Sequence, residues 1–262
     1  MWNPYDHPSK NKHRALGLGA VLTVLAIWAT LSIGGIVDAR KLPGPGEVAE
    51  AFMQLAWYEG ESKLLVATLA SVKRVFIAGL LVVSLGVPLG ILMGASPRVN
   101  AFLSPLVDPF RSAPVVAILP ILVMWLGIGE EVKVAFLFCG AFVFLVPMVR
   151  DAMQAVSQQY WIAARDLGAT PFEATWHAVL PLAKPRIADA IITAVSVMWT
   201  YITVAEYVNA TEGLGQLIQN ARRFSAMDQV FVGIGVIVAL ALITYGLMTA
   251  LKKRLYPWET ET

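Results

Sequence analysis

The chain alternates between long stretches without a charged residue and shorter polar segments. Three charge-free stretches have 23 residues each, enough for a helix to cross a hydrocarbon core of about 30 Å; they are 15–37, 75–97 and 229–251. A stretch of 18 residues, 112–129, contains Pro114 and Pro120 and is expected to kink or break there. Two more stretches, 134–149 and 190–205, have 16 residues. The pattern predicts an all-α integral membrane protein with six transmembrane helices.

The two 16-residue stretches are short for a membrane span. A helix of that length rises about 24 Å, which is less than the thickness of the hydrocarbon core. We therefore expect these two helices inside the bundle, where polar residues at their ends are tolerated. The three 23-residue helices can face lipid. Residues 38–73 are expected to form a mixed loop, with a short surface helix over 47–57 after a break at Pro45 and Gly46.

Composition supports a membrane protein and excludes several other functions. Hydrophobic residues make up 57% of the chain and charged residues 15%, against about 25% charged in a soluble domain. A net charge of +2, without a basic run that contains aromatic residues, gives no surface for nucleic acid. Cys139 is the single cysteine and His7, His13 and His177 are scattered, so neither an internal disulfide nor a metal site is expected. No Gly-Lys dipeptide occurs, which excludes a P-loop for ATP, and we expect this chain to bind no cofactor.

Residues 158–181 are the longest polar interruption between hydrophobic stretches, and they predict two short helices joined by a glycine. Gly168 follows the first helix, 158–167, at a position where a left-handed backbone is favourable without a Cβ. The second helix starts on a capping box, with Thr170 as N-cap, Pro171 at the first position and Glu173 at the third. We expect it to end at Pro181 and to have one apolar face, made of Phe172, Trp176 and Val179.

The spacing of residues 162–181 resembles the signature loop of permeases of ATP-binding-cassette (ABC) importers: Glu-Ala-Ala, three residues, Gly, nine residues, then Ile-x-Leu-Pro. Ile162 and Ala178 replace the family's Glu and Ile. In that family the loop is a cytoplasmic coupling helix that docks on the ATPase subunit. The resemblance implies an ATPase-coupling surface, with Arg165, Asp166 and Glu173 facing outward; its residues are Ala163, Ala164, Arg165, Asp166, Gly168, Glu173, Leu180 and Pro181. The alternative is an ordinary amphipathic loop helix on the membrane surface.

Further motifs resemble the nitrate/sulfonate/bicarbonate (taurine-type) branch of these permeases. They are LPGPGEV at 42–48, SVKR at 71–74, PLVDPFRSAP at 105–114, LPILVMWLGIGE at 119–130, AE at 205–206, GLG at 213–215 and L-x-P-W at 255–258. The resemblance implies a type I importer fold that performs no covalent chemistry and carries a small polar or anionic solute. It also implies the partners: a second copy of the permease in a homodimer, two ATP-binding subunits that hold ATP and Mg, and an extracytoplasmic substrate-binding protein.

The distribution of Lys and Arg orients the six predicted spans. With both termini in the cytoplasm, 12 of the 20 Lys and Arg residues lie on the cytoplasmic side, together with the loop 158–181. We therefore expect a cell inner-membrane protein with a cytoplasmic N-terminal tail (1–14), a single transmembrane permease domain (15–254) that contains the coupling-helix loop (158–181), and a cytoplasmic C-terminal tail (255–262). A secretory signal over 15–37 is the competing interpretation, but its apolar core would far exceed the usual length of about 7–15 residues.

The stretch 190–205 carries hydroxyl residues on one helix face, at i, i+3, i+7 and i+10. Hydroxyls suit a path for a small polar solute, but Ser and Thr also help helices pack closely, and both interpretations stay open. Glu206 near membrane depth requires a partner or a role, and we expect it to pair with Arg222 or Arg223. Trp125, like Trp161 and Trp199, also suits a belt at the membrane interface. The candidate residues of the translocation path are Thr193, Ser196, Thr200, Thr203, Glu206 and Trp125.

A secondary transporter driven by an ion gradient is the alternative function. Such proteins often contain inverted repeats and helices broken at the membrane midplane. We find no internal repeat in the sequence and no carboxylate at the centre of a charge-free stretch. A membrane enzyme would need a constellation of His, Cys or carboxylate residues that the sequence does not provide. We therefore expect a non-catalytic transport subunit.

Overall fold

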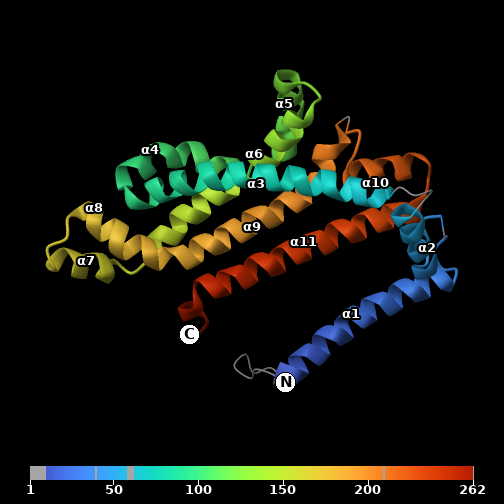
Figure 1. Cartoon of the computed structure of the whole chain (residues 1–262), viewed down its shortest axis with the longest axis horizontal. Helices are drawn as coiled ribbons and strands as arrows, with labels where there is room; N and C mark the ends of the chain where they lie inside the picture. Colours follow the sequence, from blue (N-terminus) through green and yellow to red (C-terminus); the bar gives the residue numbers. More distant parts are fainter. Residues whose placement is uncertain (1–9, 39, 58–61, 209, 262) are drawn as a thin grey trace. The chain divides into compact units, whose positions relative to one another are not determined.

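The computed structural model describes residues 10–38, 40–57, 62–208 and 210–261 (Figure 1). These residues form helices and turns, and none of them lies in a β-strand. The chain divides into two compact units: Met1–Lys63 with Asn220–Val232, and Leu64–Gln219 with Gly233–Thr262. Among the described residues, five helices are long and apolar enough to cross a membrane, or six when one bent pair counts as a span. The predicted all-helical membrane fold is therefore confirmed.

The first unit contains α1 (Lys10–Ile33) and α2 (Pro45–Ala56). The indole nitrogen of Trp28 on α1 donates to the carbonyl of Pro43 at 3.0 Å, which ties α1 to the segment that precedes α2. Glu47 accepts from the backbone nitrogen of Gly44 at 2.8 Å and so caps α2. The expected short helix is present, but Pro45 begins it instead of breaking the chain before it, because a proline lacks only an N–H that the first helical turn leaves unpaired.

The second unit holds the remaining spans. In chain order its elements are α3 (Lys63–Ala95), α4 (Pro97–Val107), η1 (Asp108–Arg111), η2 (Val115–Ile118), α5 (Leu119–Leu126), α6 (Glu130–Gln154), α7 (Gln158–Asp166), α8 (Pro171–Glu173), η3 (Ala174–Val179) and α9 (Leu180–Tyr207). The helix α10 (Leu214–Arg223) begins in this unit, and α11 (Met227–Leu255) ends in it before η4 (Pro257–Glu261).

The helices α6 and α9 pack side by side and form the core of the second unit (Figure 1). The rings of Phe136 and Tyr201 meet edge to face at 5.8 Å, and a Cβ at Gly140 would lie only 2.8 Å from the Tyr201 ring. Within this unit, buried residues make up 56% of the most apolar window of α6 and 39% of that of the span ending in α9, but 33% in α3 and 17% in α11. The expectation that the two short charge-free stretches lie inside the bundle is confirmed.

A row of glycines brings α3 against α6. Gly86, Gly90 and Gly94 are spaced by four residues and therefore share one face of α3. A Cβ at Gly90 would lie 2.6 Å from the Cβ of Val149 and 2.7 Å from the carbonyl oxygen of Val146. Small residues at this spacing let two membrane helices approach until their backbones nearly touch. The crossing of α3 and α6 therefore depends on the absence of side chains at these positions.

The third span is broken, as expected from its prolines. The segments Pro97–Arg111 and Val115–Leu126 meet at an angle of 99°. Pro114 has an extended backbone at the break, whereas Pro120 lies in the first turn of α5 and does not interrupt it. Arg150 on α6 binds the segment that precedes the break, since its Nη1 donates to both carboxylate oxygens of Asp108 at 2.8 and 2.9 Å.

The limits of several spans differ from the expected ones. The mixed loop was expected to continue to residue 73, but α3 already begins at Lys63. The helices α6 and α9 extend beyond their charge-free stretches to 25 and 28 residues. Charged residues lie within these helices, and other side chains neutralise some of them, among them Arg74, Glu130 and Glu206. A count of uncharged residues cannot detect this. The helix α1 begins at Lys10, inside the expected N-terminal tail, and residues 1–9 of that tail lie outside the described part of the chain.

The glycine crossing predicts a position-specific effect on stability. We expect Gly90→Ala to lower the free energy of unfolding by about 1–3 kcal/mol, because the added methyl overlaps Val149 and a backbone oxygen that cannot move aside. Gly79→Ala on the same helix is the matched control, since nothing lies within 4 Å of a Cβ there. Thermal unfolding of the two purified variants in detergent measures the difference. Equal melting temperatures would contradict the close approach of α3 and α6.

Candidate functional site

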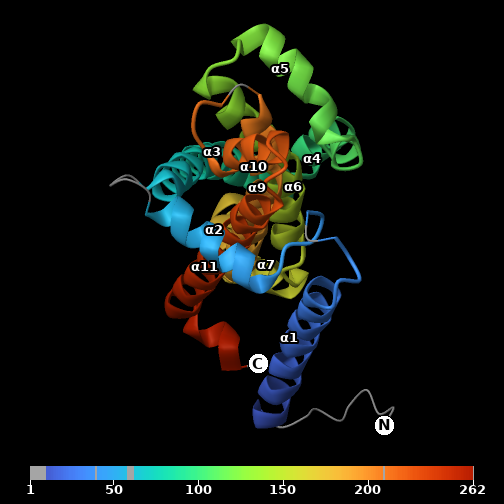
Figure 2. The same cartoon turned by 90° about the vertical axis from the view of Figure 1, so that its right-hand side faces the viewer.

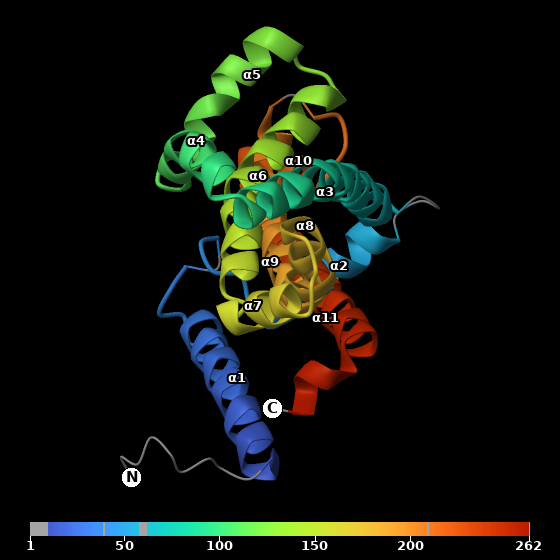
Figure 3. The same cartoon turned by 90° about the vertical axis from the view of Figure 1, so that its left-hand side faces the viewer.

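The helices α7 and α8 form a hairpin at one end of α9 (Figure 3). Gly168 joins them with a φ of +91°, in the left-handed region that favours glycine. Its backbone nitrogen donates to the carbonyl of Arg165 at 3.0 Å, and the nitrogen of Ala169 donates to that of Ala164 at 3.1 Å. These bonds close the last turn of α7 in the manner of a Schellman motif. The predicted glycine between two short helices is confirmed.

A capping box starts α8. The Thr170 hydroxyl accepts from the backbone nitrogen of Glu173 at 3.3 Å, and Glu173 Oε2 accepts from the backbone nitrogen of Thr170 at 2.7 Å. The same carboxylate oxygen accepts a hydrogen bond from the Thr170 hydroxyl at 2.8 Å. Because each residue satisfies donors of the other, the direction in which the chain leaves Gly168 is fixed by local bonds alone.

The expectation that Pro181 ends this helix is wrong. The chain continues without interruption from α8 through η3, a π-helical segment at Ala174–Val179, into α9. Pro181 lies in the first turn of α9, directly after the π segment. A π segment pairs residues five apart, and this wider turn accommodates a residue that has no N–H to donate. The hairpin is therefore joined to a transmembrane helix without an intervening loop.

The hairpin exposes apolar and charged side chains together. Leu167 is 90% exposed and Phe172 is 68% exposed, and the Phe172 ring stacks on that of Trp176 at 5.5 Å. Arg165 lies 5.7 Å from the centre of the Trp161 ring and donates to the carbonyl of Ala169 at 2.6 Å. Asp166 and Glu173 are exposed, as expected, and Val179 is half-buried. An exposed surface of this mixed character is typical of a site that binds another protein.

At the end of α6 away from the hairpin, ionic groups join α3, α6 and α9, three helices that lie beside one another in Figure 2. We call these groups the Arg74 cluster, which consists of Ser71, Arg74, Glu130, Lys133 and Glu206. Arg74 Nη1 donates to Glu206 Oε1 at 2.7 Å, while its Nε and Nη2 donate to the two oxygens of Glu130 at 2.6 and 2.8 Å. The side chains of Arg74 and Glu206 are 4% and 0% exposed. One guanidinium thus binds carboxylates from two other spans.

The Arg74 cluster also holds the segment between α9 and α10. Glu206 Oε2 accepts from the backbone nitrogen of Gly215 at 2.7 Å, and Arg74 Nη1 donates to the carbonyl of Glu212 at 2.8 Å. The Ser71 hydroxyl donates to Glu206 Oε1 at 2.7 Å and accepts from the nitrogen of Leu214 at 2.9 Å. Gly213 has a φ of +138°, and a Cβ there would lie 2.5 Å from the Glu206 carboxyl carbon, so glycine is required.

The Arg74 cluster is electrically neutral, and its second cation is Lys133. Lys133 is 3% exposed and its Nζ lies 2.7 Å from Glu130 Oε1, so two cations face two carboxylates. The side chain of Glu130 is 57% exposed, so it is the part of the cluster that lies at the protein surface. The expected pairing of Glu206 with Arg222 or Arg223 is corrected, because its partner is Arg74. Arg74 ends a polar motif in the sequence, but the structure places it within α3, where it reaches Glu206.

The hydroxyl stripe of α9 is formed, although its hydroxyls are partly occupied. Those of Thr193, Ser196 and Thr200 each donate to a carbonyl of their own helix, at 2.9, 2.8 and 2.7 Å. Thr193 and Thr200 are exposed, while Ser196 and Thr203 are half-buried. Each hydroxyl oxygen keeps acceptor capacity. Outside α9, Trp125 on α5 is 72% exposed. No contact brings Trp125 to the stripe among the described residues.

The family model described as "Binding-protein-dependent transport system inner membrane component" matches residues 86–256. The chain belongs to this family. It is 33% identical over 248 residues to the taurine transport system permease protein TauC of Escherichia coli (strain K12), covering 94% of this chain and 90% of that protein. It is 30% identical over 247 residues to SsuC of Bacillus subtilis (strain 168), whose name assigns it to aliphatic sulfonates transport, covering 92% and 87%.

Solved structures share the fold of the permease. An amino acid ABC transporter chain aligns with a TM-score of 0.62 at 19% identity, covering 72% of this chain and 92% of that one. A chain of the MetNI methionine ABC transporter in an inward facing conformation aligns with a TM-score of 0.58 at 23% identity, covering 71% and 91%. The type I importer fold expected from the motifs is confirmed, and nothing supports a secondary transporter.

Family membership identifies the chain as a multi-pass inner-membrane permease subunit of an ABC importer, with the ATPase on a separate subunit. An importer permease of this kind implies ATPase subunits and a substrate-binding protein as its partners. The permease itself is a non-catalytic transport component. Within the described residues, no group of three or more His, Cys, Asp or Glu side chains could hold a metal ion.

The Arg74 cluster was not predicted from the sequence. The motifs at 71–74, 119–130, 205–206 and 213–215 contain most of its residues, but nothing in their spacing says that they meet. Ser71 and Glu206 are separated by 135 positions, and Arg74 and Glu130 by 56. A usable signal was present all the same: Arg74 directly borders a long apolar stretch, and so does Glu206, and membrane-depth charges of opposite sign are expected to pair.

The buried pair of the permease predicts a large and non-additive effect on stability. We expect Arg74→Met to lower the free energy of unfolding by about 3–5 kcal/mol, because Glu206 is left buried without its cation. Adding Glu206→Gln to that variant should recover part of the loss, since the amide still accepts from Gly215 and carries no charge. Lys73→Met, at the exposed neighbouring position, is the control. Additive losses in the double variant, measured by chemical unfolding, would refute the pairing.

Proposed function

We propose that this permease imports a small polar or anionic solute of the nitrate/sulfonate/bicarbonate type, with organic sulfonates as the first candidates. Two relatives that cover most of the chain carry names for taurine and aliphatic sulfonates transport. The observation that supports the mechanism is the position of α6. Its first residue, Glu130, belongs to the Arg74 cluster, and its last residue, Gln154, is followed by the α7–α8 hairpin. Its 25 residues correspond to about 37 Å, which exceeds the hydrocarbon core.

The proposed orientation puts the α7–α8 hairpin and both termini in the cytoplasm, and the Arg74 cluster outside. The excess of Lys and Arg on the hairpin side supports it, as does the run Lys252, Lys253 and Arg254 at the end of α11. In this arrangement the cytoplasmic tails and the coupling-helix loop (158–181) flank a single transmembrane permease domain (15–254).

Cysteine labelling tests the orientation in intact cells. In a Cys139→Ala background, Leu167→Cys should react only with a reagent that crosses the membrane, and Thr211→Cys with one that does not. Both positions are exposed, so the side chain is accessible without rearrangement. Gly213 is unsuitable because a Cβ there overlaps Glu206. Reaction of Leu167→Cys with the impermeant reagent would invert the proposed topology.

The hairpin is proposed to couple the permease to the ATPase subunits, which would hold ATP and Mg. Its capped ends and left-handed Gly168 fix the shape of the docking surface, and its direct connection to α9 would turn a displacement of the hairpin into a displacement of that span. Movement of one pair of subunits toward another is a rigid-body switch of the kind used by many transporters. The residues proposed for this surface are Ala163, Ala164, Arg165, Asp166, Gly168, Glu173, Leu180 and Pro181.

Substitution of Gly168 tests the coupling role. We expect Gly168→Val to abolish most uptake and ATPase co-purification while the permease still inserts, because a β-branched residue at φ +91° costs about 1–3 kcal/mol locally. Nothing lies within 4 Å of a Cβ there, so the effect is one of backbone conformation. Gly168→Asn is the matched control, as Asn tolerates positive φ better, and it should retain much of the activity. Normal uptake by the Val variant would refute the proposed role.

The translocation path is proposed to run along the hydroxyl stripe of α9, between two copies of the permease. Exposed apolar residues of α5, among them Trp125, support a second copy as the neighbour of this segment. The proposed path residues are Thr193, Ser196, Thr200, Thr203, Glu206 and Trp125. A permease that purifies with its ATPase as a single copy would contradict the homodimer.

Thr200 offers the sharpest test of the path. Thr200→Val keeps the shape of the side chain, and the lost bond is one to its own helix, so assembly and basal ATP hydrolysis should stay near normal. If the hydroxyl contacts the solute, uptake of a labelled sulfonate should fall about tenfold, the effect of one lost hydrogen bond of about 1.4 kcal/mol. Leu182→Val, an exposed apolar position on the same helix, is the control. Unchanged uptake by Thr200→Val would remove the stripe from the path.

A further inference from the structure

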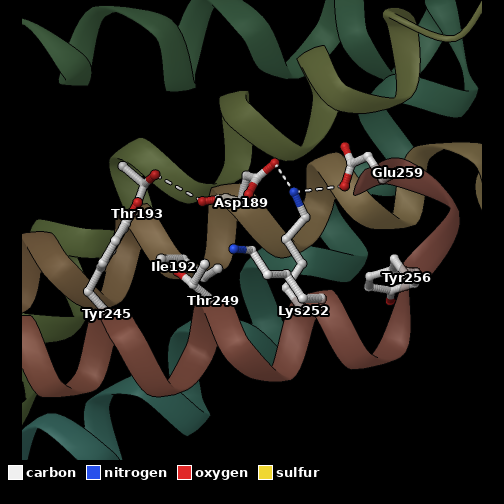
Figure 4. A pocket seen from close by; sticks show the side chains of 9 residues that line it. Asp189, Ile192, Thr193, Tyr245, Thr249, Lys252, Tyr256 and Glu259 are labelled. Carbon is white, nitrogen blue, oxygen red and sulfur yellow. Dashed lines mark hydrogen bonds and ion pairs between the residues drawn. The ribbon is translucent and has the colours of Figure 1, made fainter. Parts of the chain in front are cut away.

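A polar cavity lies between the end of α11 and the first half of α9, within the second unit (Figure 4). Its volume is about 350 Å³, room for roughly ten water molecules. Besides Ile192, every residue that lines it carries a polar group; these residues are Asp189, Thr193, Tyr245, Thr249, Lys252, Lys253, Tyr256 and Glu259. Apart from Thr193, which belongs to the hydroxyl stripe, none of them is part of the proposed transport machinery.

The two lysines of the cavity differ in their contacts. Lys252 Nζ is 2.7 Å from Asp189 Oδ2 and 2.8 Å from Glu259 Oε2, so this ammonium is held between two carboxylates, as Figure 4 shows. Lys253 also lines the cavity, and no ion pair or hydrogen bond within the described part of the chain engages its ammonium. Asp189 is 55% exposed and meets Lys252 through one of its two oxygens.

The charges that line the cavity determine which ligands it can bind. The cavity carries two cations and two carboxylates and is neutral as a whole. An anion would be attracted by Lys253 but repelled by Asp189 and Glu259, and a simple cation would meet the reverse situation. A small zwitterion can satisfy both, with its oxyanion on Lys253 and the nearby hydroxyls, and its ammonium on Asp189. The hydroxyls of Tyr245 and Thr249 can donate to the oxyanion, since neither is used by a hydrogen bond among the described residues.

The position of the cavity matches the depth of lipid headgroups. Lys252, Lys253 and Arg254 form the last turn of a membrane span. Leu251 and Leu255 beside them are each 56% exposed, and Trp258 is 57% exposed with its ring edge to face on Tyr256 at 5.5 Å. Aromatic and basic residues together at the end of a span are typical of the membrane–water interface, where pockets between helices bind headgroups.

We propose that this cavity binds a small zwitterion in which an ammonium and an oxyanion are joined by a short linker. Two sources offer this chemistry: the headgroup of phosphatidylethanolamine in the membrane, and a free aminosulfonate such as taurine. The oxyanion contacts Lys253 with Thr249 and Tyr245, and the ammonium donates to Asp189. Binding at this site is measured without transport, so its failure and that of the proposed function are distinguishable.

The lipid arm of the test uses the full chain with its ATPase subunits in nanodiscs of equimolar phosphatidylethanolamine and phosphatidylcholine. Lipid that stays bound after mild delipidation is quantified by mass spectrometry. Phosphatidylcholine is the ligand control, because its quaternary amine has no N–H to donate to Asp189. We expect about tenfold enrichment of phosphatidylethanolamine on the wild type, the effect of one charge-assisted hydrogen bond. Asp189→Asn should remove that enrichment, because it takes away the carboxylate that accepts from the ammonium. Arg254→Gln, the neighbouring cation that does not line the cavity, should keep it.

The solute arm uses labelled taurine at millimolar concentration with the same complex in nanodiscs of phosphatidylcholine only. Saturable binding that Lys253→Gln abolishes and Arg254→Gln retains assigns the site to the aminosulfonate. The proposal is overturned if neither ligand is selected, or if Asp189→Asn in the lipid arm and Lys253→Gln in the solute arm both behave like Arg254→Gln.

Discussion

The buried contact between Arg74 and Glu206 is the interaction on which the arrangement of this permease depends. Two charges removed from water are costly unless each is fully paired, and here the guanidinium and the carboxylate satisfy one another together with Ser71, Glu130 and the backbone of Gly215. Their bonds link α3, α6, α9 and the segment before α10. Helices in a membrane gain no hydrophobic free energy from contact with each other. Directional bonds of this kind, together with close packing such as that at Gly90, therefore determine which helices are neighbours.

The Arg74 cluster and the α7–α8 hairpin are stabilised by different interactions. At one end of α6 the Arg74 cluster joins three spans through charged bonds that lose much of their strength if any partner moves. Beyond the other end of α6, the α7–α8 hairpin is stabilised by its own caps, by packing of α7 on the π segment and by its continuity with α9. This difference agrees with the proposed coupling of the hairpin to the ATPase subunits.

The sequence predicts the features that depend on contacts between neighbouring residues and misses those that depend on contacts between distant ones. The hairpin was predictable residue by residue, because Gly168, Thr170 and Glu173 act on neighbours within a few positions. The continuation through Pro181 was missed because a π segment leaves no local signature in residue type. Span limits were underestimated wherever a charge is neutralised by a distant partner, and Arg74 is the example. The close approach at Gly90 was equally hidden, since a glycine in a membrane helix has many possible reasons. The differences between the predicted and the observed fold therefore come from contacts between residues far apart in the sequence, and not from errors in helix propensity.

The π segment at Ala174–Val179 has a consequence for how this subunit can change over evolutionary time. A π turn is equivalent to one residue inserted into an α-helix, and one residue corresponds to a rotation of about 100°. The angular phase of Phe172 and Trp176 relative to the membrane face of α9 is therefore set in discrete steps by the count of residues between them. Loss of a single residue would turn the hairpin's exposed rings to a different side while leaving every helix intact. Insertions and deletions at this point could thus re-aim the subunit toward a different partner without redesigning its span.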